Sequence, residues 1–164
     1  KPQKPSSKAK SAGEPVIKIL ARNRRATHDY QIEDRLEAGL VLTGSEVKSL
    51  RDQKVSIQEG FVTIRGGEAY LVNAQILEYP QAHQQNHEPT RERKLLLHRR
   101  EIAKLDTKLV QKGYSLVPMS IYIKNSRIKL EIGVGRGKKQ YEKRESVKEA
   151  EAKREIDRAM NRKR

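Results

Sequence analysis

The sequence contains no cysteine and no tryptophan, and only one phenylalanine. Without cysteine the chain can form no disulfide, no thiolate metal site and no cysteine nucleophile, which agrees with a reducing compartment. No apolar run approaches the roughly 18 residues that a membrane-spanning helix needs, and residues 1–15 lack the apolar segment of a signal peptide. We therefore expect a cytoplasmic protein with no membrane partner and a mostly aliphatic core.

Sequence motifs of enzymes are missing as well. The chain has no GxSxG or HExxH motif, and its carboxylates form no spaced acid–base pair. The segment GVGRGKK resembles a phosphate-binding loop only superficially, because Ile132 stands where the first glycine belongs and Lys139 replaces the serine or threonine. We expect no catalytic residue and no cofactor.

Two histidines, His83 and His87, lie four residues apart in a polar segment between prolines. The sequence offers no third ligand near them, so a solvated loop is favoured over a zinc site. We expect no bound metal.

Positive charge is unevenly distributed, although the net charge of the whole chain is +15. Residues 1–25 hold eight Lys or Arg against one acidic residue, and residues 135–164 hold twelve against six. Residues 26–134 are nearly neutral, with sixteen against fourteen. Basic arms of this kind favour a polyanion, because neutralised phosphates release condensed counterions. Nucleic acid is therefore favoured over an anionic membrane surface and over a mere role in solubility.

Alternating apolar and polar residues predict strands in the nearly neutral middle of the chain. Residues 30–42 have apolar side chains at even positions, which predicts either a continuous strand or a strand with a bend at Gly39. The segment TGSEVKSLR follows, and the spacing of Thr43 and Glu46 is that of a capping box at the start of a short helix.

The pair Gly66–Gly67 predicts a tight turn of a β-hairpin. The apolar residues of both strands are expected on the core face: Val62, Ile64, Tyr70, Val72, Ala74 and Ile76.

A helix is expected next, with leucine and isoleucine at helical spacing from Leu95 to Leu109 and a stop at Gly113. Residues 117–123 and 128–134 alternate again and predict two further strands around a turn at Asn125–Ser126. A proline in the first of these strands suggests an edge or a bulge.

These elements amount to five or six strands joined as hairpins, with two or three helices. Short strands leave exposed edges, and closure into a small barrel removes them. We predict a mainly β fold, a compact antiparallel barrel with attached helices. Residues 1–15 have almost no apolar side chain and are expected to be disordered.

Two basic clusters are candidate contacts with nucleic acid. In ARNRRATHDY, Asn23, Arg24 and Arg25 lead into the first expected strand, where they can reach phosphates and base edges. His28, at the same strand end, either stacks on a base or is an ordinary half-exposed strand residue.

The second cluster, TRERKLLLHRRE, places Arg93 and Lys94 just before three leucines at the expected helix start. Leucines in such a run are more often core residues than contact residues. Because three successive helical positions span about 200°, at least one leucine is expected to face outward, where it can pack on a base or sugar.

The C-terminal segment has a narrow apolar stripe, formed by Ala152, Ile156 and Met160 at a spacing of four residues. A stripe one residue wide does not hold a helix alone in water. We expect a tail that becomes helical only in a polyanionic groove, with a plain solvated tail as the alternative.

Four segments, in this order, carry a family resemblance: NRRATHDYQI, AGLVLTGSEVKSLR, PTRERKLLL and IGVGRGKKQYEKR. The chain resembles the SsrA-binding protein family of bacteria, also called small protein B, from about Ile19 to its C-terminus. The resemblance implies an OB-fold-like RNA-binding barrel over residues 19–134. It implies a disordered basic arm over residues 1–18 and a basic tail over residues 135–164, disordered when free and helical on the ribosome.

The resemblance also implies a function. Family members bind the tRNA-like end of transfer-messenger RNA (SsrA RNA) and deliver it to stalled ribosomes in trans-translation, which tags the unfinished peptide for degradation. They do no covalent chemistry and meet elongation factor Tu only indirectly, through the alanylated RNA. We expect a monomer that does not bind DNA.

Residue by residue, the resemblance assigns RNA contact to Asn23, Glu37, Lys94 and Leu96. It adds His98, at a position where some members have asparagine. A carboxylate facing RNA is unusual, and Glu37 is expected to accept from a base amino group or to orient an arginine.

The tail is implied to occupy the decoding site and the empty mRNA channel. Its basic link then lies on ribosomal RNA, Tyr141 stacks on a base, and two apolar residues face the channel wall. The residues expected to contact the ribosome are Arg136, Gly137, Lys138, Lys139, Tyr141, Lys143, Arg144, Ile156 and Met160.

Two other classes compete with this adaptor. A ribosomal protein or translation factor with basic arms has a similar charge distribution. An RNA-processing enzyme is disfavoured, because the sequence lacks a metal or acid–base constellation.

Overall fold

A computed structural model describes residues 14–111 and 113–162, apart from the side chains of Gln140 and Tyr141. Most of the expected N-terminal arm lies outside these residues. Its end does not: Ile17 and Lys18, which we had assigned to the disordered arm, belong to strand β1 (Ile17–Arg22). This strand is ordered because it pairs with β8 (Tyr114–Lys124).

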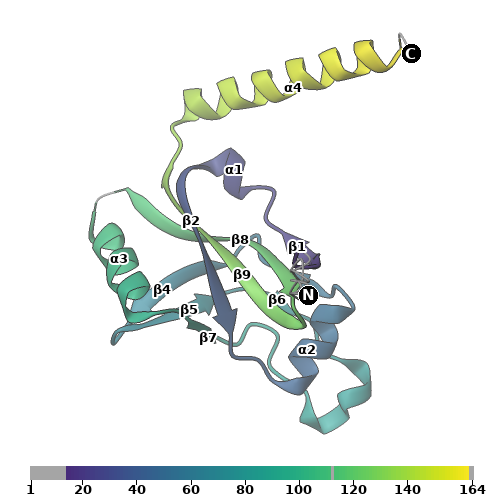
Figure 1. Cartoon of the computed structure of the whole chain (residues 1–164), viewed down its shortest axis with the longest axis vertical. Coiled ribbons are helices and arrows are strands. Elements are labelled where there is room, and N and C mark those ends of the chain that lie inside the picture. Colours follow the sequence, from purple (N-terminus) through teal and green to yellow (C-terminus); the bar gives the residue numbers. More distant parts are fainter. Residues whose placement is uncertain (1–13, 112, 163–164) are drawn as a thin grey trace, which may run out of the picture.

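An antiparallel sheet forms the body of the protein, as Figure 1 shows. Its seven strands lie in the order β1-β8-β9-β2-β7-β5-β4. The remaining members of the sheet are β2 (Tyr30–Leu40), β4 (Phe61–Arg65), β5 (Glu68–Val72), β7 (Arg93–Leu96) and β9 (Arg127–Gly137). The mainly β fold with attached helices is therefore confirmed.

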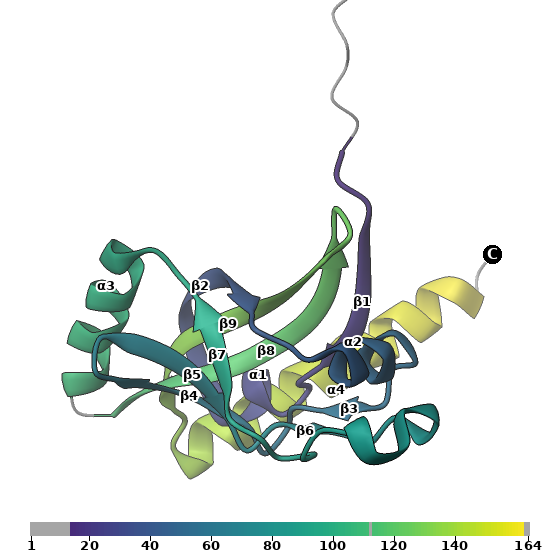
Figure 2. The ribbon, with the colours of Figure 1, turned by 90° about the horizontal axis from the view of Figure 1, so that it is seen from below.

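The sheet curls, but it does not close. Strands β1 and β4 end the strand order and are not paired with each other in the part of the chain that is described. A second small sheet, β3 (Val55–Ser56) with β6 (Gln75–Ile76), contributes to this region, and β3 lies against β1 (Figure 2). The expected closed barrel is therefore wrong. The edge strand β1 lies against β3 of the small sheet and, among the described residues, forms no ladder with β4.

Helices lie at opposite ends of the sheet (Figure 1). At one end, α2 (Gly44–Arg51) begins with the expected capping box: Thr43 N donates to Glu46 Oε1 at 3.0 Å, and Glu46 N donates to Thr43 Oγ1 at 3.4 Å. The other helices are α1 (Ala26–Asp29), the 3-10 helix η1 (Pro80–Gln85), α3 (Arg99–Val110) and α4 (Gln140–Arg162).

The core is aliphatic, as expected, but one strand has the opposite phase from the prediction. In β5, Ala69 and Leu71 are buried, whereas Tyr70 and Val72 are half-buried. Asn73 has a left-handed φ of 60°, which interrupts the alternation after the strand. Ala74 and Ile76, which follow this break, are buried as predicted.

The predicted helix over the three leucines is also wrong at its start. Leu95 lies in β7, opposite Leu40 of β2 on one side and Ala69 of β5 on the other. Strand alternation buries Leu95 and leaves Leu96 55% exposed. One leucine does face outward, but because it lies on a strand. A short apolar run does not distinguish the two structures, and α3 begins only at Arg99.

Gly135 packs against the backbone of β2 and is not a loose exit from the last strand. Strand β9 continues to Gly137, and Gly135 lies opposite Ile32. A Cβ atom at Gly135 would lie 2.3 Å from the carbonyl oxygen of Gln31. From the sequence we expect the glycines of GVGRGKK to loosen the exit from the last strand. At Gly135 this expectation is wrong, because the close approach of two strands requires the missing side chain.

We expect Gly135→Ala to lower the free energy of unfolding by about 1–3 kcal/mol, since the methyl group forces β2 and β9 apart. Urea denaturation measures the loss. Gly137→Ala is the matched control, because nothing lies within 4 Å of a Cβ atom there. Equal stability of the two variants would contradict the packing role of Gly135.

The C-terminal segment is helical in the structure, in helix α4 (Gln140–Arg162), and its disorder in the free protein stays a prediction. Helix α4 stands clear of the sheet and joins it beside α1 (Figure 1). Its sequence is rich in Glu, Lys, Arg and Ala, which favour helix, and Lys139 N donates to Glu142 Oε2 at 3.0 Å near its start. Beyond its first two turns the helix is exposed. Both Ile156 and Met160 remain available to a partner.

Candidate nucleic-acid interface

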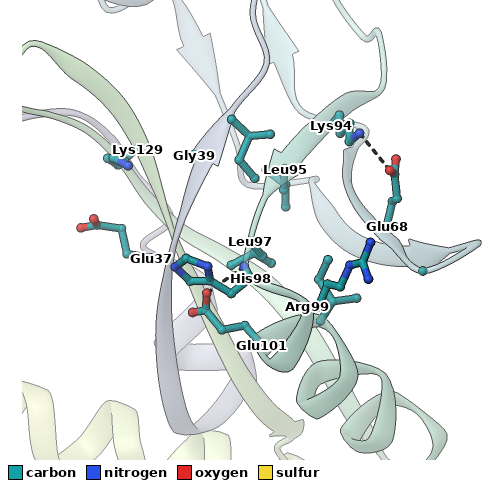
Figure 3. A pocket seen from close by; sticks show the side chains of 13 residues that line it. Glu37, Gly39, Glu68, Lys94, Leu95, Leu97, His98, Arg99, Glu101 and Lys129 are labelled. Carbon is teal, nitrogen blue, oxygen red and sulfur yellow. Dashed lines mark hydrogen bonds and ion pairs between the residues drawn. The ribbon is translucent and has the colours of Figure 1, made fainter.

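A depression of about 580 Å³ opens where β2, β7, β9 and the start of α3 meet. Figure 3 shows the side chains that line it. We call it the Lys94 groove. Its lining includes four residues for which the family resemblance implies RNA contact, namely Glu37, Lys94, Leu96 and His98. These four residues, which are up to 61 positions apart in the sequence, thus lie on one surface.

The fold explains why these side chains meet. Lys94 and Leu96 leave the same face of β7, because alternate residues of a strand point the same way. His98 directly precedes α3, where its backbone N–H donates to Glu101 Oε1 at 3.0 Å and its side chain stays exposed. Glu37 comes from β2, the neighbour of β7 in the sheet.

Glu37 is an oriented, ionised acceptor. The Tyr122 hydroxyl donates to its Oε2, and Lys124 Nζ lies 3.3 Å from the same oxygen. The hydrogen bond from Tyr122, followed by the attraction of Lys124 and Lys129, outweighs burial and lowers the pKa of Glu37. Nearby lysines therefore offset the negative charge that made a carboxylate unusual at an RNA-facing position.

Lys94 is held in place by a second carboxylate. Its Nζ lies 2.9 Å from Glu68 Oε1, shown as a dashed line in Figure 3. This hydrogen bond and the negative charge of Glu68 raise the pKa of Lys94, so it is protonated at neutral pH. The ammonium group is half-exposed and can bind a phosphate while Glu68 fixes its position.

Arg93 is fully buried, so its expected contact with RNA is wrong. Its guanidinium forms an ion pair with Glu46 and donates to the carbonyl oxygens of Ala74 at 2.8 Å and Pro89 at 3.0 Å. The alternation of β7 that turns Lys94 outward turns Arg93 inward. Arg93 joins α2, β7 and the preceding loop and so supports the groove from below.

The basic residues near α1 form a separate surface and do not line the Lys94 groove. Arg24 is exposed, and Arg25 Nη1 lies 3.2 Å from Glu59 Oε1. His28 lies in α1 and not on a strand, and its Nδ1 is 2.8 Å from Asp29 Oδ1.

Asn23 is buried beside this surface. Its Nδ2 donates to the Pro118 carbonyl oxygen at 2.9 Å, and its backbone N–H donates to the Met119 carbonyl oxygen at 2.8 Å. Its Oδ1 has no hydrogen-bond partner within the described part of the chain. Asn23 therefore holds α1 on β8 and has one acceptor left.

Several predicted ribosome contacts are engaged with the body. The Arg136 guanidinium lies 4.6 Å from the ring centre of Tyr114, and Lys138 Nζ donates to the Thr27 carbonyl oxygen at 2.9 Å. Lys143 Nζ lies 3.6 Å from Asp29 Oδ1.

Other residues of the predicted tail set are less engaged. Gly137, Lys139 and Arg144 are exposed, and the side chain of Tyr141 lies outside the structural description. The base of the tail is therefore a fixed contact with α1, and the exposed cations begin beyond it.

His87 is a structural residue and not part of a solvated loop. It is buried, with Nδ1 2.9 Å from Ser45 Oγ and Nε2 2.9 Å from the Ile76 carbonyl oxygen. Within residues 14–111 and 113–162 no group of three or more His, Asp or Glu side chains is arranged to hold a metal. No helix in these ranges is long and apolar enough to cross a membrane.

Sequence reasoning missed Arg99 and Lys129, which line the groove, and Tyr122, which orients Glu37. The basic cluster included Arg99 but gave it no role. The positions of Lys129 and Tyr122 depend on strand pairing. Lys129 of β9 lies opposite Gly39 of β2 on one side and opposite Tyr122 of β8 on the other. Only that register could have revealed them.

Comparison with known proteins agrees with this geometry. The family model described as SmpB protein matches residues 20–162. An SsrA-binding protein of Thermobifida fusca (strain YX) is 56% identical over 147 residues, which cover 90% of this chain and 92% of the relative. An SsrA-binding protein of Roseiflexus castenholzii (strain DSM 13941 / HLO8) is 51% identical over 149 residues, covering 90% and 94%.

The fold also matches a solved structure described as "tmRNA-SmpB: a journey to the center of the bacterial ribosome". The matched chain is 45% identical with a TM-score of 0.63, and the match covers 73% of this chain and 85% of that chain. Together, the family model and the relatives show that the chain belongs to the SmpB protein family.

Proposed function

We propose that this protein is an RNA-binding adaptor of trans-translation, which binds the tRNA-like domain of transfer-messenger RNA and delivers it to stalled ribosomes. The observation that carries the proposal is the Lys94 groove, which gathers Glu37, Lys94, Leu96 and His98 on one surface. The names of the relatives and the description of the matched structure support the same partners.

Each side chain of the groove has a distinct role in this proposal. Lys94 neutralises a phosphate, and the oriented carboxylate of Glu37 accepts from a base amino group. The exposed Leu96 packs against a splayed base or a sugar, as single-stranded parts of an RNA allow. His98 donates one hydrogen bond from its exposed ring. These contacts bind RNA without covalent chemistry, and no step requires a cofactor.

The tail contacts a second RNA. Helix α4 carries an exposed apolar stripe at Ile156 and Met160 within a cationic segment, which suits a groove walled by ribosomal RNA. We assign it to the decoding site and the empty mRNA channel, with Tyr141 stacking on a base of the decoding centre. The protein then works in the cytoplasm as a monomer and meets elongation factor Tu only through the alanylated RNA.

A gel-shift competition tests this function. The full chain is expected to prefer the tRNA-like domain of transfer-messenger RNA over duplex RNA of equal length by at least about tenfold at physiological salt, because non-specific binding depends mostly on phosphate number. A general ribosomal protein with basic arms would bind both RNAs equally, and that result would reject the adaptor.

A further inference from the structure

A second depression, of about 300 Å³, lies beside the Lys94 groove, between the end of β2, α2 and the β8–β9 turn. We call it the Val47 pocket. The two hollows share Gly39, Leu96 and Lys129. A Cβ atom at Gly39 would lie 3.1 Å from Leu96 Cβ, so the leucine rests directly on this glycine and forms the ridge between the hollows.

The Val47 pocket has an aliphatic floor and a cationic rim. The floor is formed by half-buried side chains that still have accessible surface: Leu40, Leu42, Val47, Ile123 and Ile128. The rim carries Arg51, Arg127 and Lys129, and no carboxylate lines the pocket. The Lys94 groove differs, since Glu37, Glu68 and Glu101 line it.

The two arginines of this rim are uncompensated. Neither the Arg51 nor the Arg127 side chain forms a hydrogen bond, ion pair or ring contact with another residue of the described ranges, although both are exposed. Three other cations of the body, Arg25, Arg65 and Lys94, are each paired with a carboxylate. Free guanidinium groups beside an apolar hollow match a ligand that combines a negative charge with a flat apolar group.

We propose that the Val47 pocket binds one unpaired nucleotide of the RNA that occupies the Lys94 groove. The base packs on the aliphatic floor, and Arg51 and Arg127 hold the flanking phosphates. Continuity over Leu96 favours the same RNA, and the volume is at the lower end of the roughly 300–1,000 Å³ of small-molecule sites. This inference rests on the proposed function, because it extends the same RNA-binding surface.

The rim is tested with the full chain and the tRNA-like domain of transfer-messenger RNA. The double variant Arg51→Gln with Arg127→Gln is expected to lose affinity about tenfold and to reduce the slope of log K against log salt by about 1.4, at about 0.7 for each single-stranded phosphate. The matched control is Lys54→Gln with Lys104→Gln, which removes two exposed cations that line neither hollow. The control slope is expected to stay close to that of the unaltered protein.

The floor is tested by photocrosslinking from a benzophenone amino acid introduced at Val47. Crosslinks are expected at one unpaired nucleotide, mapped by reverse-transcription stops. The same amino acid at Val110, which is 82% exposed at the end of α3, is the control and is expected to give no discrete stop. Absent or scattered stops from position 47 would overturn the inference.

Failure of the inference differs from failure of the function. If the unaltered protein prefers the tRNA-like domain but the rim variant behaves like its control, only the Val47 pocket is rejected. If the rim substitutions instead convert a dimer into a monomer in light scattering and leave RNA affinity unchanged, the face belongs to a second copy of the chain and the inference is wrong. Loss of the preference in the unaltered protein rejects both.

Discussion

Glu46→Ala is expected to lower the free energy of unfolding by about 3–5 kcal/mol, because it leaves a buried guanidinium without its counterion. Both Glu46 and Arg93 are fully buried, and Arg91 supplies a second guanidinium to the same carboxylate. Glu46 also accepts from the Thr43 N–H at the start of α2. Urea denaturation followed by circular dichroism measures the loss.

Glu59→Ala is the control for this change. Glu59 pairs with Arg25, but the two side chains are 74% and 64% exposed, so solvent screens their attraction. Such a surface pair contributes about 0–1 kcal/mol. Equal losses for Glu46→Ala and Glu59→Ala would show that burial does not govern the effect.

The stability that Glu46 contributes also has a defined pH dependence. Burial alone raises the pKa of Glu46, but the Thr43 N–H and the two guanidinium groups outweigh it and hold the pKa below its ordinary value. The stabilisation is therefore fully present above the unfolded-state pKa of about 4.3. It is lost as the pH falls through the lower folded-state pKa. In acid titrations of stability, Glu46→Gln should lack this component.

The same ion pair matters for the groove, because Arg93 and Lys94 are neighbours on opposite faces of β7. Arg93 fixes the strand from inside the core, and Lys94 presents its ammonium group outside. Sequence composition alone does not distinguish the buried Arg93 from the exposed Lys94, since both residues belong to one basic cluster. Predicting a strand here would have placed the two side chains on opposite faces, whereas the predicted helix start did not.

Local signals explain which elements the sequence could predict. The capping box of α2 and the two tight turns depend on residues close together in the chain. Gly66 and Gly67 have φ angles of 56° and 76°, and Asn125 and Ser126 have 50° and 64°. All four lie in the left-handed region that such turns require, so their residue types predict the turns directly.

The elements that were missed depend on distant partners. Strand β7 has only four residues and is stabilised between β2 and β5, which the sequence pattern does not reveal. Strand β1 likewise requires β8 as its partner. The Lys94 groove is a tertiary feature of the same kind. Periodicity did not single out Glu37, and a family resemblance was needed to connect it with β7.

A variant that ends at Lys139 is expected to lose peptide tagging on stalled ribosomes while its affinity for the tRNA-like domain stays nearly unchanged. This end point keeps all of β9, and it keeps the Lys138 contacts with the Thr27 and Asp29 carbonyl oxygens. It removes α4 with its cations and its exposed apolar stripe. A reconstituted translation reaction on a message without a stop codon measures tagging, and a gel shift measures RNA affinity.

Glu37→Ala is the reciprocal variant, expected to weaken RNA binding first. Losing a hydrogen bond to a charged group costs about 1.5–3 kcal/mol, which corresponds to roughly 10–150-fold in affinity. Glu37→Gln retains an acceptor for the Tyr122 hydroxyl and separates the effect of charge from that of geometry. Tagging by Glu37→Ala should recover when the RNA concentration is raised, whereas the truncated chain should not recover at any concentration. If removal of α4 abolished binding of the tRNA-like domain, the proposal that the body binds transfer-messenger RNA and the tail binds ribosomal RNA would be wrong.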